Sequence, residues 1–271
     1  MDEEARVVAE GYDRIAKKYA ETAQRLSARD EKYLHLLLER LPKGRVLDLG
    51  CGPGGAITRN LEVRYEVVGV DFSAAALRLA QKALAGATFV RADMTALPFR
   101  HETFDAVCSF LAIIHTPRRG HVQLLRDLHD LLRPRGLLLV VLGADEGEAF
   151  GEFMGVPMYW SHFDAATNLS LVEGAGFIVL ASSVEGQRFE GTYEEHLYVL
   201  AEKRWMGSRP GEPPRGIMRR NDDGREADKA REEGHRGRSS EIARGDRHPS
   251  VNALGRPSHR AYRYPRRSSY G

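Results

Sequence analysis

The sequence has few cysteines and no long hydrophobic run. Cys51 and Cys108 are the only two cysteines, too few for a disulfide framework or a zinc site, and their apolar settings favour reduced thiols. No stretch approaches the roughly 18 consecutive apolar residues that a membrane-spanning helix needs. The acidic, helical start of the chain also lacks the apolar core of a signal peptide. We therefore expect a cytoplasmic protein without a membrane partner.

Two further motifs are missing. The glycine-rich run near residue 50 is not followed by Gly-Lys-Ser/Thr, which excludes a Walker loop that would bind nucleoside triphosphates. Acidic residues form no cluster that indicates a metal site, so none is predicted. The sequence does not indicate an oligomeric state.

Charge is distributed unevenly along the chain. Residues 1–206 hold 24 Lys and Arg against 29 Asp and Glu, whereas residues 207–271 hold 16 against 9. The second segment has only four Leu, Ile, Val and Phe residues together, so we expect a disordered basic tail. It is either an inert extension, a tether for nucleic acid or another acidic surface, or a segment that folds on binding a partner. The acidic balance of residues 1–206 argues against nucleic acid binding outside the tail.

Between residues 45 and 206, short apolar runs alternate with helical stretches. This pattern predicts a doubly wound, Rossmann-like α/β fold with a seven-stranded, mostly parallel sheet and helices on both faces. The seventh strand, residues 194–204, follows a turn-rich segment and should be reversed in a hairpin. Residues 3–24 and 28–41 are predicted helices within an N-terminal unit, residues 1–44.

The glycine run "VLDLGCGPGG", residues 46–55, fits two chemistries. It satisfies the dinucleotide pattern G-x-G-x-x-G, and a glycine loop after a first strand offers backbone N–H groups to an anion. Against a pyrophosphate, Asp48 lies just before the first glycine, Pro53 lies inside the turn, and Asp93 follows the third strand. Asp71, after the second strand, suits both chemistries because its carboxylate can accept hydrogen bonds from ribose hydroxyls.

Four strand-end motifs together carry a family resemblance. In order and spacing, "VLDLGCGPGG", "GVDFS", "RADMTALPF" and "FDAVCSFLAIIHTP" resemble the class I S-adenosylmethionine-dependent methyltransferases, and most closely the methyltransferase-11-like, small-molecule type. The resemblance covers about residues 7–204. It implies S-adenosylmethionine as the cofactor and a small-molecule substrate. "SFLA" stands where an Asn-Pro-Pro-Tyr/Phe run would follow the fourth strand, which argues against methylation of nucleobase amines or glutamine amides.

The resemblance also implies a site. The glycines would let the main chain approach the methionine part, with Asp48 near its amino group. Asp71 would bind the ribose, Phe72 would pack on adenine, and Asp93 would accept a hydrogen bond from the adenine amine. Residues 1–44 would supply a lid helix over the cofactor. The implied cofactor-binding set is Tyr12, Tyr19, Asp48, Gly50, Cys51, Gly52, Gly54, Asp71, Phe72, Asp93, Met94, Ser109 and Phe110.

Tyr12 and Tyr19 have two interpretations. An aromatic face beside a sulfonium gains from cation–π attraction. However, the two side chains share one helical face, so ordinary packing also explains them.

His115 is the predicted general base, because it follows the fourth strand directly and its usual pKa suits proton transfer. The alternative is that it only binds its own loop or caps the next helix.

Residues 151–164 contain four aromatic side chains within eleven residues. We interpret the segment as a long functional loop that forms the substrate wall, with Tyr159, Trp160 and His162 facing the acceptor. A small apolar cluster under the loop is the alternative. Asp164 is better explained as the cap of the next helix.

Three functions remain open. The first is a methyltransferase acting on a small organic acceptor at O, N or C. The second is a cofactor-binding protein without catalysis, since a fold does not guarantee an activity. The third is a macromolecule methyltransferase that uses the basic tail.

Overall fold

The computed structural model describes residues 2–189 and 192–204. The predictions made for residues 207–271 lie outside this part of the chain. The described helices are α1 (Glu3–Thr22), α2 (Ala28–Arg40), α3 (Ala56–Glu62), α4 (Ala74–Ala83), α5 (Arg118–Leu131) and α6 (Ala165–Gly174), with a short 3₁₀ helix, η1 (Ile113–His115). None of these helices is both long and apolar enough to cross a membrane.

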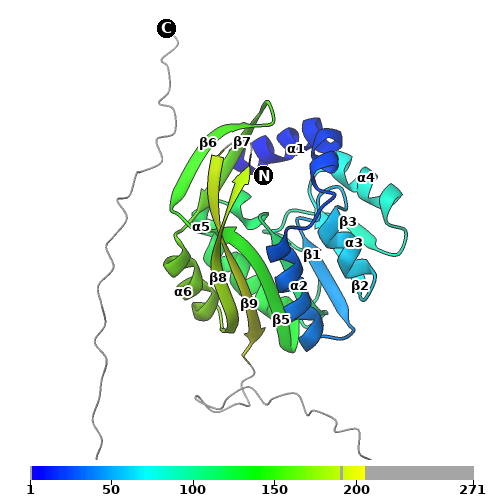
Figure 1. Ribbon diagram of the computed structural model, residues 1–271, viewed down its shortest axis with the longest axis vertical. Coiled ribbons are helices and arrows are strands. Elements are labelled where there is room, and N and C mark those ends of the chain that lie inside the picture. Colours follow the sequence, from blue (N-terminus) through cyan, green and yellow to red (C-terminus); the bar gives the residue numbers. More distant parts are fainter. Residues whose placement is uncertain (1, 190–191, 205–271) are drawn as a thin grey trace, which may run out of the picture. The chain divides into compact units, whose positions relative to one another are not determined.

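Seven strands form the central sheet (Figure 1). They are β1 (Arg45–Leu49), β2 (Glu66–Asp71), β3 (Thr88–Arg91), β4 (Phe104–Phe110), β5 (Leu132–Gly143), β8 (Phe177–Phe189) and β9 (Thr192–Lys203). Their order is β3-β2-β1-β4-β5-β9-β8. β1 to β5 pair in parallel, and β9 is antiparallel to both β5 and β8. The predicted doubly wound sheet with one reversed strand is confirmed.

Side chains along the buried strands point alternately to the two faces of the sheet, so each face has its own apolar core. Leu47 and Leu49 of β1 belong to one cluster with leucines of α5, whereas Val46 belongs to the other with Leu37 of α2. Successive strand residues point to opposite faces, so the continuous apolar runs that predicted a two-sided sheet are explained by burial on both sides. Helices α5 and α6 cover one face, and α2 and α3 cover the other.

The segment predicted as a loop is a β-hairpin, so that prediction was wrong. β6 (Gly147–Phe153) pairs antiparallel with β7 (Val156–His162) through the two-residue turn Met154-Gly155. Both turn residues have positive φ, at 53° and 90°, which is the geometry of a tight I′ turn matched to strand twist. The sequence signal was weak because methionine is an unusual residue at such a position.

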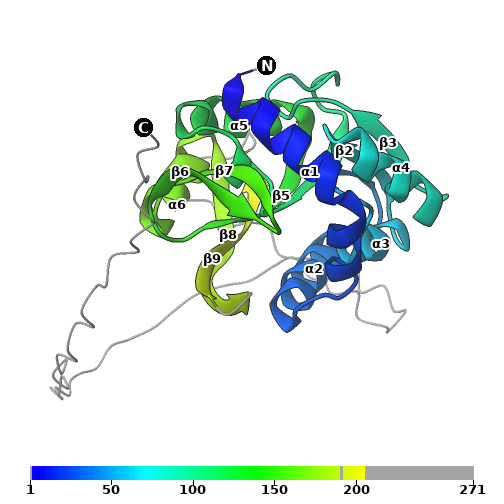
Figure 2. The same ribbon diagram turned by 90° about the horizontal axis from the view of Figure 1, so that it is seen from above.

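Helix α1 packs on this hairpin (Figure 2). Val8 and Ile15 of α1 join Met158 of β7 in a third apolar cluster, separate from the two sheet cores. The contact is close, because a Cβ added at Gly11 would lie 2.8 Å from the carbonyl oxygen of Pro157. Helix and hairpin therefore fit together as one packed layer.

Candidate functional site

A cavity of about 340 Å³ opens beyond the carboxyl ends of β1 to β4. The strand order reverses between β1 and β4, and ligands of open α/β sheets bind at such a reversal. We call the loops after these four strands the floor of the cavity. Helix α1 supplies further lining residues, among them Tyr12, Ala16 and Tyr19, and we call it the roof.

The first floor loop follows β1. Gly50 has a φ of 77°, and a Cβ at this position would lie 2.1 Å from Cβ of Ala112. Only glycine fits so close an approach in the left-handed region. The amides of Gly50 and Cys51 donate to the carbonyl of Val70, and the amide of Gly52 donates to Asp71. These N–H groups are therefore used inside the chain and do not form a free anion cradle, which disfavours a pyrophosphate ligand.

Asp71 ends β2 and lines the cavity. One carboxylate oxygen accepts from the Gly52 amide at 3.0 Å and the other from the Ser73 amide at 2.8 Å. Burial raises the pKa of Asp71 to about 6 in spite of these bonds. A carboxylate has about four lone-pair sites, so both oxygens keep capacity for ligand hydroxyls.

Asp48 has a different environment. It is buried outside the cavity wall and accepts a hydrogen bond of 2.7 Å from the Thr58 hydroxyl of α3. Burial raises its pKa to about 6, and the negative charge of Asp71 adds to this shift. The two carboxylates thus influence each other, although only Asp71 is among the residues lining the cavity.

The third floor loop carries Asp93 and Met94, which both line the cavity. One oxygen of Asp93 accepts from the amide and the hydroxyl of Thr95, at 2.9 and 2.7 Å. These bonds fix the carboxylate at the end of β3. Phe72, from the loop after β2, also lines the cavity.

The roof is attached to the floor through Asp13. Its carboxylate accepts from the Ser73 hydroxyl at 2.6 Å and from the Ala75 amide at 2.9 Å. α1 therefore caps the N-terminus of α4, where unpaired amides favour a negative charge. On the same helix, Tyr12 and Tyr19 meet edge to face with ring centroids 5.4 Å apart.

His115, in η1, connects the floor to the hairpin and to helix α1. Its Nδ1 lies 2.7 Å from the carbonyl oxygen of Tyr159 on β7, and its Nε2 lies 2.9 Å from the hydroxyl of Tyr12 on α1. Burial lowers the pKa of the imidazole to about 4. His115 is therefore neutral at physiological pH, and the usual pKa on which the general-base prediction partly rested is not kept in the folded chain.

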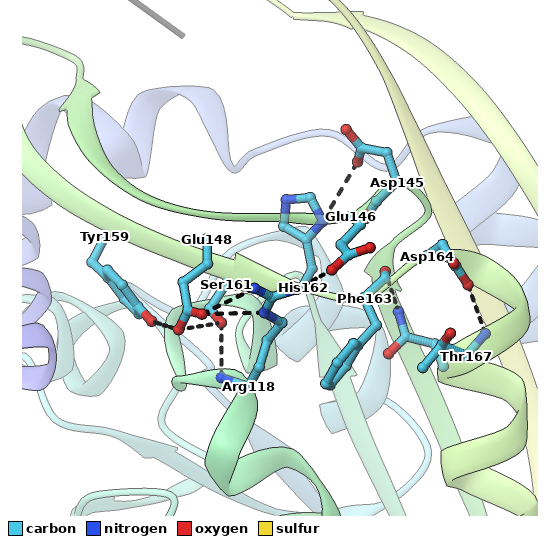
Figure 3. A network of polar contacts seen from close by, with 11 residues as sticks. Arg118, Asp145, Glu146, Glu148, Tyr159, Ser161, His162, Phe163, Asp164 and Thr167 are labelled. Carbon is cyan, nitrogen blue, oxygen red and sulfur yellow. Dashed lines mark hydrogen bonds and ion pairs between the residues drawn. The ribbon is translucent and has the colours of Figure 1, made fainter. Parts of the chain in front are cut away.

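A polar network holds the hairpin against the start of α5 (Figure 3). The Arg118 guanidinium pairs with Glu148 of β6 and with Glu146, which directly precedes β6, and its amide donates to the Ser161 hydroxyl at 2.8 Å. The Tyr159 hydroxyl donates to Glu148. The adjacent Arg119 pairs with Asp2 and Glu4 beside the roof. One helix start thus binds both the hairpin and α1.

The predicted site residues divide into two groups. The cavity brings together Tyr12, Tyr19, Gly50, Gly52, Asp71, Phe72, Asp93, Met94, Phe110 and His115. Asp48, Cys51, Gly54 and Ser109 are not among its lining residues. Gly54 instead lies against Ala80 of α4, and the buried Ser109 hydroxyl has no hydrogen-bond partner within the described chain.

The three predicted wall residues also lie outside the cavity lining. Tyr159 is buried and binds Glu148, Trp160 has its ring 6.4 Å from that of His115, and His162 packs on Gly143. The hairpin therefore backs His115 and α1. Asp164 caps α6 through the Thr167 amide, as predicted.

Sequence reasoning missed two residues that shape this site. Asp13 anchors the roof, and Phe153 places its ring 6.4 and 6.2 Å from those of Tyr12 and Tyr19. A helix-period pattern marks only the apolar face of α1, so an anchoring acid on that helix carries no signal of its own. Phe153 belonged to the segment predicted as a loop.

Comparisons with known proteins agree with this geometry. A family model described as a methyltransferase domain matches residues 46–136. A malonyl-[acyl-carrier protein] O-methyltransferase from Halorhodospira halophila is 30% identical over 226 residues, which cover 78% of this chain and 72% of that protein. One of the same name from Pseudescherichia vulneris is 37% identical over 131 residues, 48% of this chain. The chain spans about half, 51%, of that relative's length.

A solved S-adenosylmethionine-dependent methyltransferase from Methanosarcina mazei has the same fold, with a TM-score of 0.56 at 20% identity over 66% of this chain and 98% of that one. The family-model match, the relatives and the shared fold all agree with the strand-end motifs that carried the resemblance. This chain belongs to the class I S-adenosylmethionine-dependent methyltransferases.

Proposed function

We propose that the protein transfers the methyl group of S-adenosylmethionine to an O, N or C atom of a small organic acceptor. The observation that carries the proposal is the cavity at the strand-order reversal, with Asp71 and Asp93 on its floor and two tyrosines on its roof. The names of the relatives, which specify an O-methyltransferase, support the reaction class.

The residues present fit this cofactor. The loop amides that an anion would need are already bonded within the chain, whereas carboxylates suit the hydroxyls and amines of a nucleoside joined to an amino acid. Asp71 is proposed to bind the two ribose hydroxyls, Asp93 the adenine amine and Phe72 the face of the base. Asp48 does not line the cavity. We propose that its negative charge, buried beneath the floor, attracts the amino group of the cofactor without direct contact.

The cofactor supplies a methyl group already activated on a sulfonium, so the protein has mainly to align the reactants and exclude water. Tyr12 and Tyr19 place aromatic rings on the roof, and such faces attract a cation. Helix α1, held by Asp13 on one side and by the hairpin on the other, is proposed to be the lid that keeps water out.

His115 is proposed as the general base. A backbone carbonyl can only accept a hydrogen bond, so the contact with Tyr159 places the imidazole hydrogen on Nδ1. Nε2 then keeps its lone pair for a proton on the cavity side, where it meets Tyr12. This orientation by a second group is how proteins set which nitrogen acts as the base.

The size of the cavity favours a small acceptor. At about 340 Å³ it lies at the low end of the roughly 300–1,000 Å³ typical of ligand pockets. This size supports a small-molecule acceptor.

Titration calorimetry with S-adenosylmethionine tests the cofactor proposal, and binding at one site per chain is expected. A metabolite library screened for formation of S-adenosylhomocysteine then tests methyl transfer. Binding without turnover of any member would favour a non-catalytic cofactor-binding protein. No binding at all would refute the proposed function.

His115→Gln tests the base. It should lower kcat by about 10²-fold or more with cofactor affinity unchanged. His101→Gln, at an exposed turn away from the cavity, is the matched control and should keep full turnover. Equal kcat for His115→Gln and wild type would reject the base.

A further inference from the structure

Tyr12 and His115, which line the cavity, and the Tyr159 carbonyl behind them form a hydrogen-bonded line with a fixed direction. The Tyr159 carbonyl can only accept, so His115 donates to it from Nδ1. Nε2 of a neutral imidazole then carries a lone pair and must be the acceptor, which makes the Tyr12 hydroxyl, 2.9 Å away, the donor. The single hydrogen of Tyr12 is thereby used. Its oxygen can only accept a further hydrogen bond.

Both ionisable members of this line are held neutral. His115 is half-buried among the Tyr12 ring, the Trp160 ring and the Tyr159 backbone, and its desolvation lowers its pKa. The same burial raises the pKa of the Tyr12 phenol well above its usual value. The direction of the hydrogen bonds is therefore kept across the physiological pH range.

The charges around this line have one sign. Asp2, Asp71 and Asp93 line the cavity, and none of the described residues that line it is lysine or arginine. The guanidinium of Arg119 pairs with Asp2 and Glu4. A carboxylate acceptor beside Tyr12 would lose part of its hydration and would find no lysine or arginine among these lining residues, which costs free energy.

We propose that the methyl acceptor carries a hydrogen on the atom to be methylated, as a phenol, enol or alcohol hydroxyl does, and that Tyr12 selects it by accepting that hydrogen. Carboxylate acceptors are excluded by the same oxygen, which presents lone pairs to their negative charge. This inference rests on the proposed methyl transfer. It predicts that the acceptor of this chain differs from that of the relatives named malonyl-[acyl-carrier protein] O-methyltransferase.

The proton has a complete path. The acceptor O–H bond would break and its electron pair would remain on the acceptor oxygen. That oxygen would form the new bond to the methyl carbon as the carbon–sulfur bond of the cofactor breaks and its electron pair goes to sulfur. The released proton goes to the Tyr12 oxygen as the Tyr12 proton passes to Nε2 of His115. The imidazolium so formed replaces the positive charge that methyl transfer removes, so the site keeps its net charge.

Nitrogen-15 NMR of the histidine rings in the full chain tests the direction of the line without any turnover. The signal that His115→Asn removes should show a hydrogen on Nδ1 and an unprotonated Nε2 from pH 8 to pH 5. A hydrogen on Nε2, or titration of this ring near its usual pKa, would overturn the proposal. This measurement tests the proposal even if none of the acceptors tried is methylated.

Acceptor panels test the selectivity. Phenols and alcohols are compared with malonate and other dicarboxylates, and S-adenosylhomocysteine is measured. We expect kcat/KM for the best hydroxyl acceptor to exceed that for any carboxylate by about a hundredfold or more, because an unpaired polar group at a buried site rejects the wrong ligand strongly. Turnover of carboxylates alone, with S-adenosylmethionine binding intact, would overturn the inference and leave the proposed function standing.

Tyr12→Phe removes the selecting oxygen. It should lower kcat for hydroxyl acceptors about a hundredfold and should not lower kcat/KM for carboxylates. Tyr65→Phe is the matched control, since its hydroxyl donates to the Leu41 carbonyl at 2.7 Å outside the site, and it should keep wild-type turnover. Unchanged kcat for Tyr12→Phe would contradict the role of Tyr12.

Discussion

The floor and the roof of the cavity are built on different principles. The floor consists of loops at the ends of parallel strands, where the sheet core fixes the backbone and Asp71 receives two amide hydrogen bonds. The roof is one amphipathic helix, held by Asp13 and by a small aromatic and apolar cluster. Under the proposed function, cofactor recognition belongs to the floor, whereas acceptor recognition lies where roof, floor and hairpin meet at His115.

Among the variants that test this difference between floor and roof, Gly50→Ala should have the largest effect on stability. The added Cβ would lie 2.1 Å from Cβ of Ala112, at a φ of 77°. Overpacking and left-handed strain together should lower the free energy of unfolding by about 3–5 kcal/mol, measured by chemical denaturation. Gly174→Ala, with nothing within 4 Å, is the control and should be neutral or stabilising by about 0.5 kcal/mol. Equal stability of the two variants would contradict the rigid floor.

Asp71→Asn should weaken S-adenosylmethionine binding by about 2–4 kcal/mol, because two hydrogen bonds to a charged acceptor are lost. Calorimetry measures the change. Asp164→Asn removes a carboxylate of equal size that caps α6, and asparagine caps equally well, so its affinity should equal that of the wild type. If both variants bind alike, the floor does not recognise the cofactor.

The floor should also respond to pH. Burial raises the pKa of Asp71 and of Asp48 to about 6, so both groups are partly protonated at pH 5.5. Affinity for the cationic cofactor should fall about tenfold from pH 7.5 to pH 5.5, and Asp48→Asn should reduce that fall. Calorimetry across this range measures it. A flat profile would show that these carboxylates do not interact with the ligand.

The same shifts have a defined sign for stability without ligand. The folded-state pKa values lie above the unfolded value, so the folded chain holds more protons between about pH 4 and pH 6. These two groups therefore lower stability as pH rises through that window. His115, whose folded-state pKa is lowered to about 4, acts in the opposite direction.

The smallest effect should come from the polar network behind the roof. Arg118→Ala breaks the contacts with Glu146 and Glu148. It should cost about 1 kcal/mol or less, because these pairs are partly exposed. Hydrogen exchange should become faster in residues 147–162 and stay unchanged in the floor strands. Arg6→Ala, which breaks an exposed pair within α1, is the control, and equal exchange in both variants would refute the role of the network.

The sequence predicted the floor better than the roof, for a physical reason. Asp71 ends β2 and Asp93 follows the edge strand β3, and the carboxyl ends of parallel strands meet at one edge of the sheet. The register of the strands then placed both carboxylates correctly. Asp48 precedes the end of β1 by one residue, and its side chain is buried against Thr58. This difference of one position along the strand explains why Asp71 lines the cavity and Asp48 is buried.

The roof depends on contacts that no local pattern contains. Tyr12 and His115 are 103 residues apart and meet only after α1 is docked. The hairpin turns at Met154-Gly155 without the Asn-Gly or Asp-Gly pair that signals such turns. Its aromatic residues therefore predicted a substrate wall, whereas the structure places them behind His115.

A crystal structure of the full chain with S-adenosylhomocysteine tests the central claim most directly. We predict that the ligand occupies the cavity, with both ribose hydroxyls within hydrogen-bond distance of Asp71 and the sulfur beside the Tyr12–His115 pair. A ligand bound elsewhere, or ribose hydroxyls that face away from Asp71, would contradict it.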